Sequence, residues 1–257
     1  MTECAVEDTA EFYKLYFRPK VPCIMRKAFE IPASWFSDED LKEIDWRPVV
    51  VEQQNRVIHS HRKPFWLAWS FRRFVNAYRH NPYYLINPNV PAALLPEVPL
   101  HLRCTRLARA LKHRRLWFSG GNTTSSLHFD THDNFVQQIT GTKEVFIWHP
   151  NEARNVYMDS DIRYGLSPIN VDTVDLKRFS AFARASPPLY AALEPGDQLY
   201  IPWGFWHQLR APIGRNAMIT NEFEARVPTP PSDHDLTSSQ AFLRAFKINI
   251  NNQAMRC

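Results

Sequence analysis

The chain has 257 residues, of which 44% are hydrophobic and 13% aromatic, and it carries a formal net charge of +5. This length suits one domain with a well-filled core, because barrels of this size commonly remain single. The modest positive charge permits an acidic or nucleic-acid partner but does not require one.

The cysteines are scattered and include no Cys-x-x-Cys pair: Cys4, Cys23, Cys104 and Cys257. This spacing argues against a zinc finger or a disulfide scaffold and is typical of a reducing compartment. The sequence shows no signal peptide and no apolar run of membrane-spanning length. We therefore expect a soluble intracellular protein of the cytoplasm, the nucleus or both, with no membrane partner.

The first 115 residues predict helices and strands that pack on the rest of the chain. Residues 9–28 predict a short helix and then a strand at residues 23–25, and Val49–Val51 predicts a buried strand. Ser37 and Ser70 are each expected to cap the start of a helix. After Ser70, apolar residues recur at helical spacing, which indicates core packing rather than a binding site: Phe71, Phe74, Val75 and Tyr78.

Residues 103–115 form the most basic run of the chain. A solvated face is the more common explanation of such a run. The alternative is an RNA-binding surface, but no aromatic residues are interleaved there as stacking platforms. The arginines concerned are Arg103, Arg106, Arg109, Arg114 and Arg115.

The second half of the chain predicts mostly β-structure. Residues 134–148 read as two strands joined through Gly141, which predicts a hairpin. By the period of two, Lys143, Val145 and Ile147 share one face of the second strand. A lysine on an otherwise apolar face either reaches out to water or meets an anion that is not part of the protein.

His128 and Asp130 are two residues apart, so on a strand both side chains leave the same face. A solvated or hydrogen-bonded pair is the common explanation of this spacing. A third ligand could come from His207, which follows a Pro-Gly-Asp turn and a short apolar run. Two histidines and a carboxylate leave one side of a metal open, as non-haem Fe(II) oxygenases require, although catalytic zinc also suits such a set.

Five positions together resemble the pattern of the JmjC and cupin-like Fe(II)/2-oxoglutarate oxygenases, among them the asparaginyl hydroxylase that inhibits hypoxia-inducible factor. The pattern is H-x-D-x-x-x-N, a lysine, and a distant histidine after G-D-x-L-x-I-P, and the matching residues are His128, Asp130, Asn134, Lys143 and His207. The resemblance covers roughly residues 10–226. It implies that His128, Asp130 and His207 hold Fe(II), and that Lys143 pairs with the C5 carboxylate of 2-oxoglutarate, with O2 as co-substrate.

Further positions resemble family residues that lie near 2-oxoglutarate. Ser125, three residues before His128, and Tyr84 match hydroxyl groups that assist the C5 carboxylate. Asn134 and Asn221 are similar to asparagines near the cofactor. The resemblance therefore implies a cofactor set of Lys143, Ser125, Tyr84, Asn134 and Asn221.

The fold implied by the resemblance is a double-stranded β-helix, the cupin or jelly-roll barrel of JmjC type, with flanking helices. We expect residues 116–227 to form the barrel core and residues 1–115 to pack on it. Residues 228–257 are expected to be a linker and a short helix, and the whole to be one structural domain. Residues 151–189 predict a long loop with a short helix near residues 176–182, and such insertions are commonly functional.

The substrate is open at this level. A protein side-chain hydroxylase is the first hypothesis, because the compact layout has no chromatin-reading module. An N-methyl-lysine demethylase is the second. An RNA-modifying hydroxylase of the wybutosine type is the third, because its H-Y-D-x-x-D-N motif resembles residues 128–134. A non-catalytic cupin that only binds ligands is the last, and the complete ligand set with Lys143 argues against it. Monomer and homodimer both remain open.

Four charged or titratable residues near these motifs have simpler interpretations. Asp133 is expected to form a turn, and His132 to lie at the surface or behind the ligands. Glu222 and Glu224 fit the open end of a barrel, and solvent exposure explains them equally well.

Overall fold

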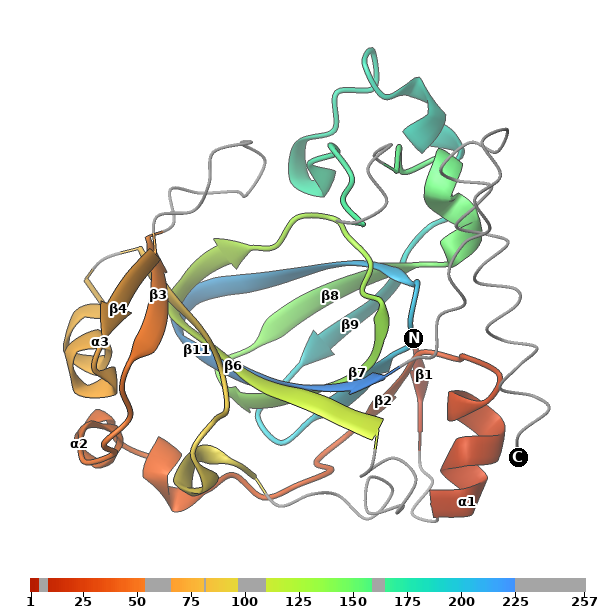
Figure 1. Cartoon of the computed structure of the whole chain (residues 1–257). Helices are drawn as coiled ribbons and strands as arrows, with labels where there is room; N and C mark the ends of the chain where they lie inside the picture. The colour runs from red at the N-terminus through yellow and green to blue at the C-terminus, as the bar shows by residue number, and fades with distance from the viewer. Residues whose placement is uncertain (5–8, 54–65, 81, 97–109, 159–164, 225–257) are drawn as a thin grey trace.

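The computed structural model describes residues 1–4, 9–53, 66–80, 82–96, 110–158 and 165–224. Its centre is a barrel of mostly antiparallel strands with short helices around it (Figure 1). The strands are β1 (Thr2–Glu3), β2 (Cys23–Met25), β3 (Val49–Gln53), β4 (Trp66–Trp69), β5 (Tyr83–Pro88), β6 (Leu111–Thr124), β7 (His132–Thr140), β8 (Lys143–Trp148), β9 (Leu189–Leu193), β10 (Gln198–Ile201) and β11 (Trp206–Glu224).

The helices are short and lie outside the barrel. The α-helices are α1 (Thr9–Phe12), α2 (Asp38–Lys42) and α3 (Phe71–Ala77), and a π-helical turn, η1 (Tyr13–Phe17), continues α1. The 3-10 turns are η2 (Ala33–Trp35), η3 (Ala92–Leu94), η5 (Pro150–Arg154), η7 (Val171–Thr173) and η8 (Ser180–Arg184). No helix within the described ranges is long and apolar enough to cross a bilayer.

The long strand β11 holds the barrel together. It pairs with β6 along most of its length, with β8 at residues 206–210, and with β7 at residues 217–224. Because β8 and β7 pair with opposite ends of β11 while β6 runs beside most of it, β11 links the two walls of the barrel, as a strand of a jelly roll does. The predicted double-stranded β-helix is therefore confirmed.

The hairpin predicted at residues 134–148 is wrong. β7 pairs with β10 and β11, whereas β8 pairs with β9 and β11, so these consecutive strands lie on different walls. Gly141 makes the corner between them with φ +70, and a Cβ at this position would overlap the carbonyl of Arg215. The glycine thus serves a tight corner against β11 rather than a two-strand turn.

The predicted N-terminal elements are confirmed. Ser37 Oγ accepts the Asp40 N–H at 3.0 Å, and Ser70 Oγ accepts the Arg73 N–H at 3.3 Å, so both serines cap helices. The apolar stripe that follows Ser70 is buried in the core beside β3 and β6. This region also extends the sheet, because β2 pairs with β10 and β5 pairs with β6.

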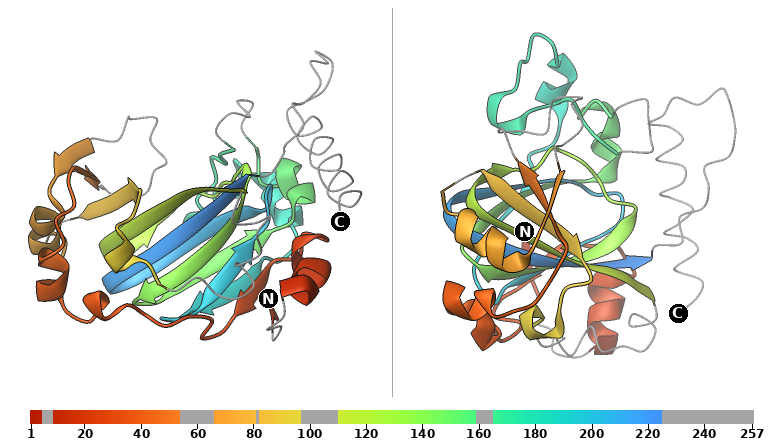
Figure 2. Two further views of the ribbon diagram at one scale, coloured as in Figure 1. Left: turned by 60° about the horizontal axis from the view of Figure 1, so that its bottom comes forward. Right: turned by 60° about the vertical axis from the view of Figure 1, so that its left-hand side comes forward.

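The insertion between β8 and β9 stands out from the barrel, at the top of Figure 1 and of the right-hand view of Figure 2. It contains η5, η7 and η8, and the helix predicted near residues 176–182 is displaced to Ser180–Arg184. Leu176 precedes it and is exposed. The linker and short helix predicted within residues 228–257, and the arginines at 103–109, lie outside the described residues.

A buried ion pair joins the N-terminal segment to β7. Lys20 Nζ lies 2.7 and 2.6 Å from the two carboxylate oxygens of Asp133, and both side chains are at most 2% exposed. The Tyr200 hydroxyl and the Trp203 N–H each donate to Asp133 Oδ1 at 3.0 Å. Burial lowers the pKa of Lys20, and Asp133 opposes that shift. Asp133 is therefore the acceptor of a buried network, and its predicted role in a turn is wrong.

We expect Lys20→Met to lower the free energy of unfolding by about 3–5 kcal/mol, because it leaves the Asp133 carboxylate buried without its cation. The matched control is Lys42→Met, which removes an exposed pair with Glu39 and should cost about 0–1 kcal/mol. Urea denaturation of the three proteins at pH 7 measures both values. Equal stabilities of the two variants would contradict the structural importance of the buried pair.

Candidate active site

The site is organised by a backbone bridge between His128 and His207. The His128 N–H donates to the His207 carbonyl at 3.1 Å, and the His207 N–H donates to the His128 carbonyl at 2.7 Å. Directly opposed residues in an antiparallel pair place their side chains on the same face and close together. The two imidazole rings accordingly lie 4.3 Å apart, centroid to centroid.

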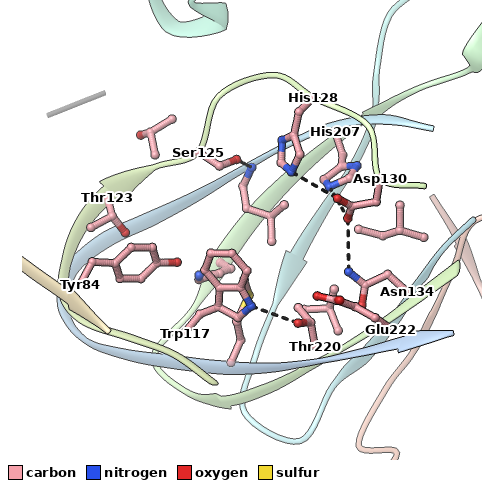
Figure 3. A pocket seen from close by; sticks show the side chains of 16 residues that line it. Tyr84, Trp117, Thr123, Ser125, His128, Asp130, Asn134, His207, Thr220 and Glu222 are labelled. Carbon is pink, nitrogen blue, oxygen red and sulfur yellow. Dashed lines mark hydrogen bonds and ion pairs between the residues drawn. The ribbon is translucent and has the colours of Figure 1, made fainter. Parts of the chain in front are cut away.

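Asp130 reaches the same point from two residues beyond His128. Its carboxylate oxygens lie 4.0 Å from His128 Nε2 and 3.6 Å from His207 Nε2. One ligand atom from each of the three residues lies within 4.8 Å of the others. The predicted triad is therefore brought together, with all three side chains converging at one side of the pocket (Figure 3).

Backbone contacts fix the tautomer of both histidines. His128 Nδ1–H donates to the Ser126 carbonyl at 2.8 Å, and His207 Nδ1–H donates to the Phe205 carbonyl at 2.9 Å. A carbonyl can only accept, so each Nδ1 carries the proton and each Nε2 lone pair faces the triad. This orientation of a ring by its second nitrogen is typical of metal-binding histidines.

The protonation states also suit a cation. Burial and the neighbouring His128 lower the pKa of His207 to about 4, so this ring is neutral at pH 7. Burial alone would raise the pKa of Asp130, but attraction to His207 and His128 lowers it overall. Metal binding needs neutral imidazoles and an ionised carboxylate. The donor set and its charges therefore fit Fe(II), as they fit other divalent ions of the same preference.

Lys143 is buried and lines the same pocket. The residue is 3% exposed, which excludes the alternative that its side chain reaches out to water. In the part of the chain that the structure describes, no carboxylate pairs with the Lys143 ammonium. Its Nζ lies over the Tyr84 ring, 5.9 Å from the ring centroid. Burial lowers the pKa of Lys143 to about 7. A buried amine beside an open cavity, without an anion, fits the far carboxylate of 2-oxoglutarate.

Ser125 and Tyr84 both line the pocket with Lys143, as predicted. Ser125 Oγ accepts the Leu209 N–H at 2.9 Å, so its own hydroxyl proton stays available to donate. Burial raises the pKa of the Tyr84 hydroxyl, with Glu52 adding to the shift, so the phenol remains a donor. Two hydroxyl donors therefore line the pocket that contains the Lys143 ammonium.

Asn134 and Asn221 differ in position. Asn134 lines the pocket, where its Nδ2 lies 3.5 Å from Asp130 Oδ2, and its buried Oδ1 has no partner among the described residues. Asn221 does not join them, because its Nδ2 donates to the Phe135 carbonyl and to Gln137 Oε1. Its neighbours in β11, Thr220 and Glu222, face the pocket instead.

Several lining residues were not predicted as site residues. Trp117 of β6 lies across the pocket from the triad and donates its Nε1–H to Thr220 Oγ1 at 3.0 Å (Figure 3). Thr123 and Thr124 belong to the end of the same strand. On β11 the lining residues are Met218, Thr220 and Glu222. Their spacing of two in the sequence was the signal that could have found them, because it places all three on one face of the strand. Glu222 was considered for the open end of the barrel, and it does line the pocket.

Comparison with known proteins agrees with this geometry. The family described as "Cupin-like domain" matches residues 9–225. Lysine-specific demethylase 8 of Danio rerio is 35% identical over 96 residues, which are 37% of this chain and 23% of that protein. tRNA wybutosine-synthesizing protein 5 of Danio rerio is 33% identical over 84 residues, which are 33% of this chain and 24% of that protein.

The aligned segments thus span about a quarter of the length of those curated relatives. Among solved structures, the X-ray structure of E. coli ycfD superposes with a TM-score of 0.53 at 15% identity, covering 98% of this chain and 68% of that one. At this identity the likeness concerns the fold alone. The resemblance expected from the sequence is confirmed, and the chain belongs to the family of cupin-like domains, alongside JmjC proteins.

Proposed function

We propose that this chain is an Fe(II)- and 2-oxoglutarate-dependent oxygenase that hydroxylates a side chain of a protein substrate. The main support for the proposal is that one pocket contains two features. These are a triad of two histidines and a carboxylate, and a buried lysine without a carboxylate partner among the described residues. A metal site alone would suit many enzymes, but the lysine adds a place for a dicarboxylate.

Each polar residue of the pocket has a distinct proposed role. His128, Asp130 and His207 would hold Fe(II) and leave its remaining positions to the co-substrates. Lys143 would bind the C5 carboxylate of 2-oxoglutarate, with the Ser125 and Tyr84 hydroxyls donating beside it. Asn134, which contacts Asp130, would orient that ligand and offer its amide oxygen to the pocket.

The iron and 2-oxoglutarate supply the oxidising chemistry when bound. The overall reaction takes up O2, converts 2-oxoglutarate to succinate and CO2, and places the second oxygen atom in a C–H bond of the substrate. The protein contributes position and exclusion of water. The walls of the pocket do this with apolar residues, among them Val136, Ile201 and Met218.

Two other substrate classes have specific support among the relatives. One relative carries the name of a lysine demethylase and another that of a tRNA-modifying protein. The described part of the basic run gives the RNA alternative little support, because Arg115 pairs with Glu222 and Lys112 pairs with Glu224. A cupin that only binds ligands would have no use for a complete triad beside Lys143.

The first test is removal of a metal ligand. His128→Ala or Asp130→Ala should lower Fe(II)-dependent succinate formation by roughly 100-fold or more, since loss of groups that merely support a ligand already costs 10–100-fold. His132→Ala is the control, because His132 lies outside the triad and should keep both metal and turnover. Undiminished turnover in the first two variants, or activity with zinc and no 2-oxoglutarate, would contradict the proposal.

The second test is Lys143→Ala. Removing one member of a desolvated charge pair costs about 3–5 kcal/mol, so the affinity for 2-oxoglutarate should fall by two to three orders of magnitude. Metal content should be unchanged, because Lys143 is not a ligand. Lys143→Arg should restore the affinity only in part, because the planar head cannot occupy the same point. Titration of 2-oxoglutarate with parallel metal analysis measures this, and wild-type affinity in Lys143→Ala would refute the cofactor assignment.

The affinity for 2-oxoglutarate measured in this titration should depend on pH. Because burial lowers the pKa of Lys143 to about 7, the free amine is mostly neutral above that pH and must take up a proton when 2-oxoglutarate binds. The affinity should therefore decrease as pH rises above 7, approaching tenfold per unit. In Lys143→Arg this dependence should vanish, because a guanidinium keeps its charge.

Salt dependence separates protein from RNA substrates. Contacts to phosphates release counterions, so binding to RNA weakens steeply with salt. We expect activity on a peptide substrate to change little between 50 and 200 mM salt, and neutralising Arg114 with the arginines at 103–109 to leave it intact. A loss of roughly a thousandfold over that range, together with loss of activity in the neutralised variant, would favour RNA.

A further inference from the structure

The short segment that carries His128 is paired on both of its sides. On one side the bridge between His128 and His207 joins it to β11, which pairs in turn with β8. On the other side Leu166, which belongs to the insertion between β8 and β9, lies directly opposite His128. The insertion therefore supplies the second neighbour of the segment that carries a proposed metal ligand.

Two backbone hydrogen bonds from the insertion flank His128. The Ser167 N–H donates to the Leu127 carbonyl at 2.9 Å, and the Phe129 N–H donates to the Gly165 carbonyl at 3.0 Å. The hydrogen bonds of His128 itself run to β11 instead. The backbone before and after His128 is thus held by residues 165–167, while His128 is held by the barrel.

Ser167 connects residues 165–167 to the rest of the insertion. The residue is 3% exposed. Its hydroxyl donates to the Val156 carbonyl at 2.5 Å and accepts the Ile169 N–H at 3.1 Å. Both partners are fully buried. The Ser167 hydroxyl therefore fixes the direction in which residues 165–167 run beside the barrel.

Gly165 lets the same residues lie close to Phe129. Its φ is +53, and a Cβ at this position would lie 2.7 Å from the Phe129 carbonyl oxygen and 3.0 Å from the Phe129 ring. Glycine adopts this backbone conformation without strain and leaves room for the approach. A side chain here would push residues 165–167 away from the residue that follows His128.

The direction of the His128 ring depends on this backbone. Its Nδ1–H donates to the Ser126 carbonyl at 2.8 Å, and that carbonyl belongs to the peptide group that Ser126 shares with Leu127. The carbonyl that Ser167 holds belongs to the next peptide group. His207, in contrast, lies in a strand that β8 holds. The insertion thus bears on His128 more directly than on His207.

We propose that Gly165 and Ser167 are positioning residues of the metal site, which hold His128 in the orientation that binds the metal. This inference rests on the proposed function, because it assigns part of the geometry of that site to the insertion. Neither residue is among those that line the described pocket. Both act through the backbone on either side of His128.

The tautomers of the two histidines in the metal-free protein test the proposal directly. Nitrogen NMR of the imidazoles should show one tautomer for each ring of the wild type, with the proton on Nδ1. In Ser167→Ala and in Gly165→Ala, we expect a mixture of tautomers at His128 and a single tautomer at His207. The control is Ser180→Ala, which changes an exposed serine of η8 in the same insertion and should leave both rings unchanged.

Binding of Co(II) alone measures the consequence for the metal. Loss of groups that orient a metal ligand costs roughly 10–100-fold in affinity, so Ser167→Ala and Gly165→Ala should each weaken Co(II) binding by about this factor. The double variant should bind little more weakly than the weaker single variant, because both changes release the same residues. Ser167→Thr, which keeps the hydroxyl, should retain most of the affinity.

Wild-type Co(II) affinity together with a single His128 tautomer in both alanine variants would overturn the inference. Equal changes at His128 and His207 would also overturn it, since a general loss of structure affects both rings. If Gly165→Ala does not fold, Ser167→Ala and Ser167→Thr decide in its place, by loss and recovery of the single tautomer. Failure of the proposed function has a different result. The wild type would then form no succinate with Fe(II) and 2-oxoglutarate, while the tautomer of His128 would still depend on Ser167.

Discussion

The pair of backbone hydrogen bonds between His128 and His207 is the constraint on which the site depends. It joins residues that are far apart in the sequence and makes their imidazoles neighbours. Because β6 and β8 both hold the start of β11, the position of His207 is set by the barrel and not by its own loop. A slip of one residue in this register would turn His207 away from Asp130, since alternate residues face opposite sides. The geometry of the proposed metal site is thus a consequence of strand pairing.

The same barrel keeps in the pocket one ammonium group, that of Lys143, which no carboxylate of the described residues neutralises. Burial lowers the pKa of Lys143, so this group would gain from an anionic ligand. Burying such groups costs stability in the ligand-free protein. Ligands that bind the folded state recover stability in proportion to their affinity. Such a protein is less stable without its ligand than with it, and its pocket selects the ligand by charge.

The sequence was informative where function depends on local spacing. His128 and Asp130 lie two apart on an extended segment, and Lys143 lies on the buried face of β8, so period-two reasoning placed all three correctly. It failed where pairing is non-local. The corner at Gly141 resembles a hairpin turn, and nothing within residues 134–148 indicates that β7 and β8 pair with different strands. For the same reason the partner of Asp133 was missed, because Lys20 is more than a hundred residues away.

Asn221, which the resemblance placed near the cofactor, does not line the pocket, whereas its neighbour Glu222 does. The pairing of β11 with β6 shifts register between residues 213 and 216 and again between Glu222 and Phe223, and its pairing with β7 shifts between Ala217 and Met218. Each irregularity can change which alternate residues face inward. The parity of a residue beyond such shifts therefore cannot be counted from His207 along the sequence.

The Lys20–Asp133 pair extends this argument to the N-terminal segment. Asp133 and Asn134 are adjacent in β7, so they face opposite sides, with Asp133 outward to Lys20 and Tyr200 and Asn134 inward to Asp130. Four hydrogen bonds to Asp133 hold the start of β7 from outside the barrel. These hydrogen bonds fix the direction in which the Asn134 side chain points. Because Asn134 contacts Asp130, they also influence the position of a proposed metal ligand. Residues 9–25, remote from the pocket in sequence, are in this sense part of the support of the site.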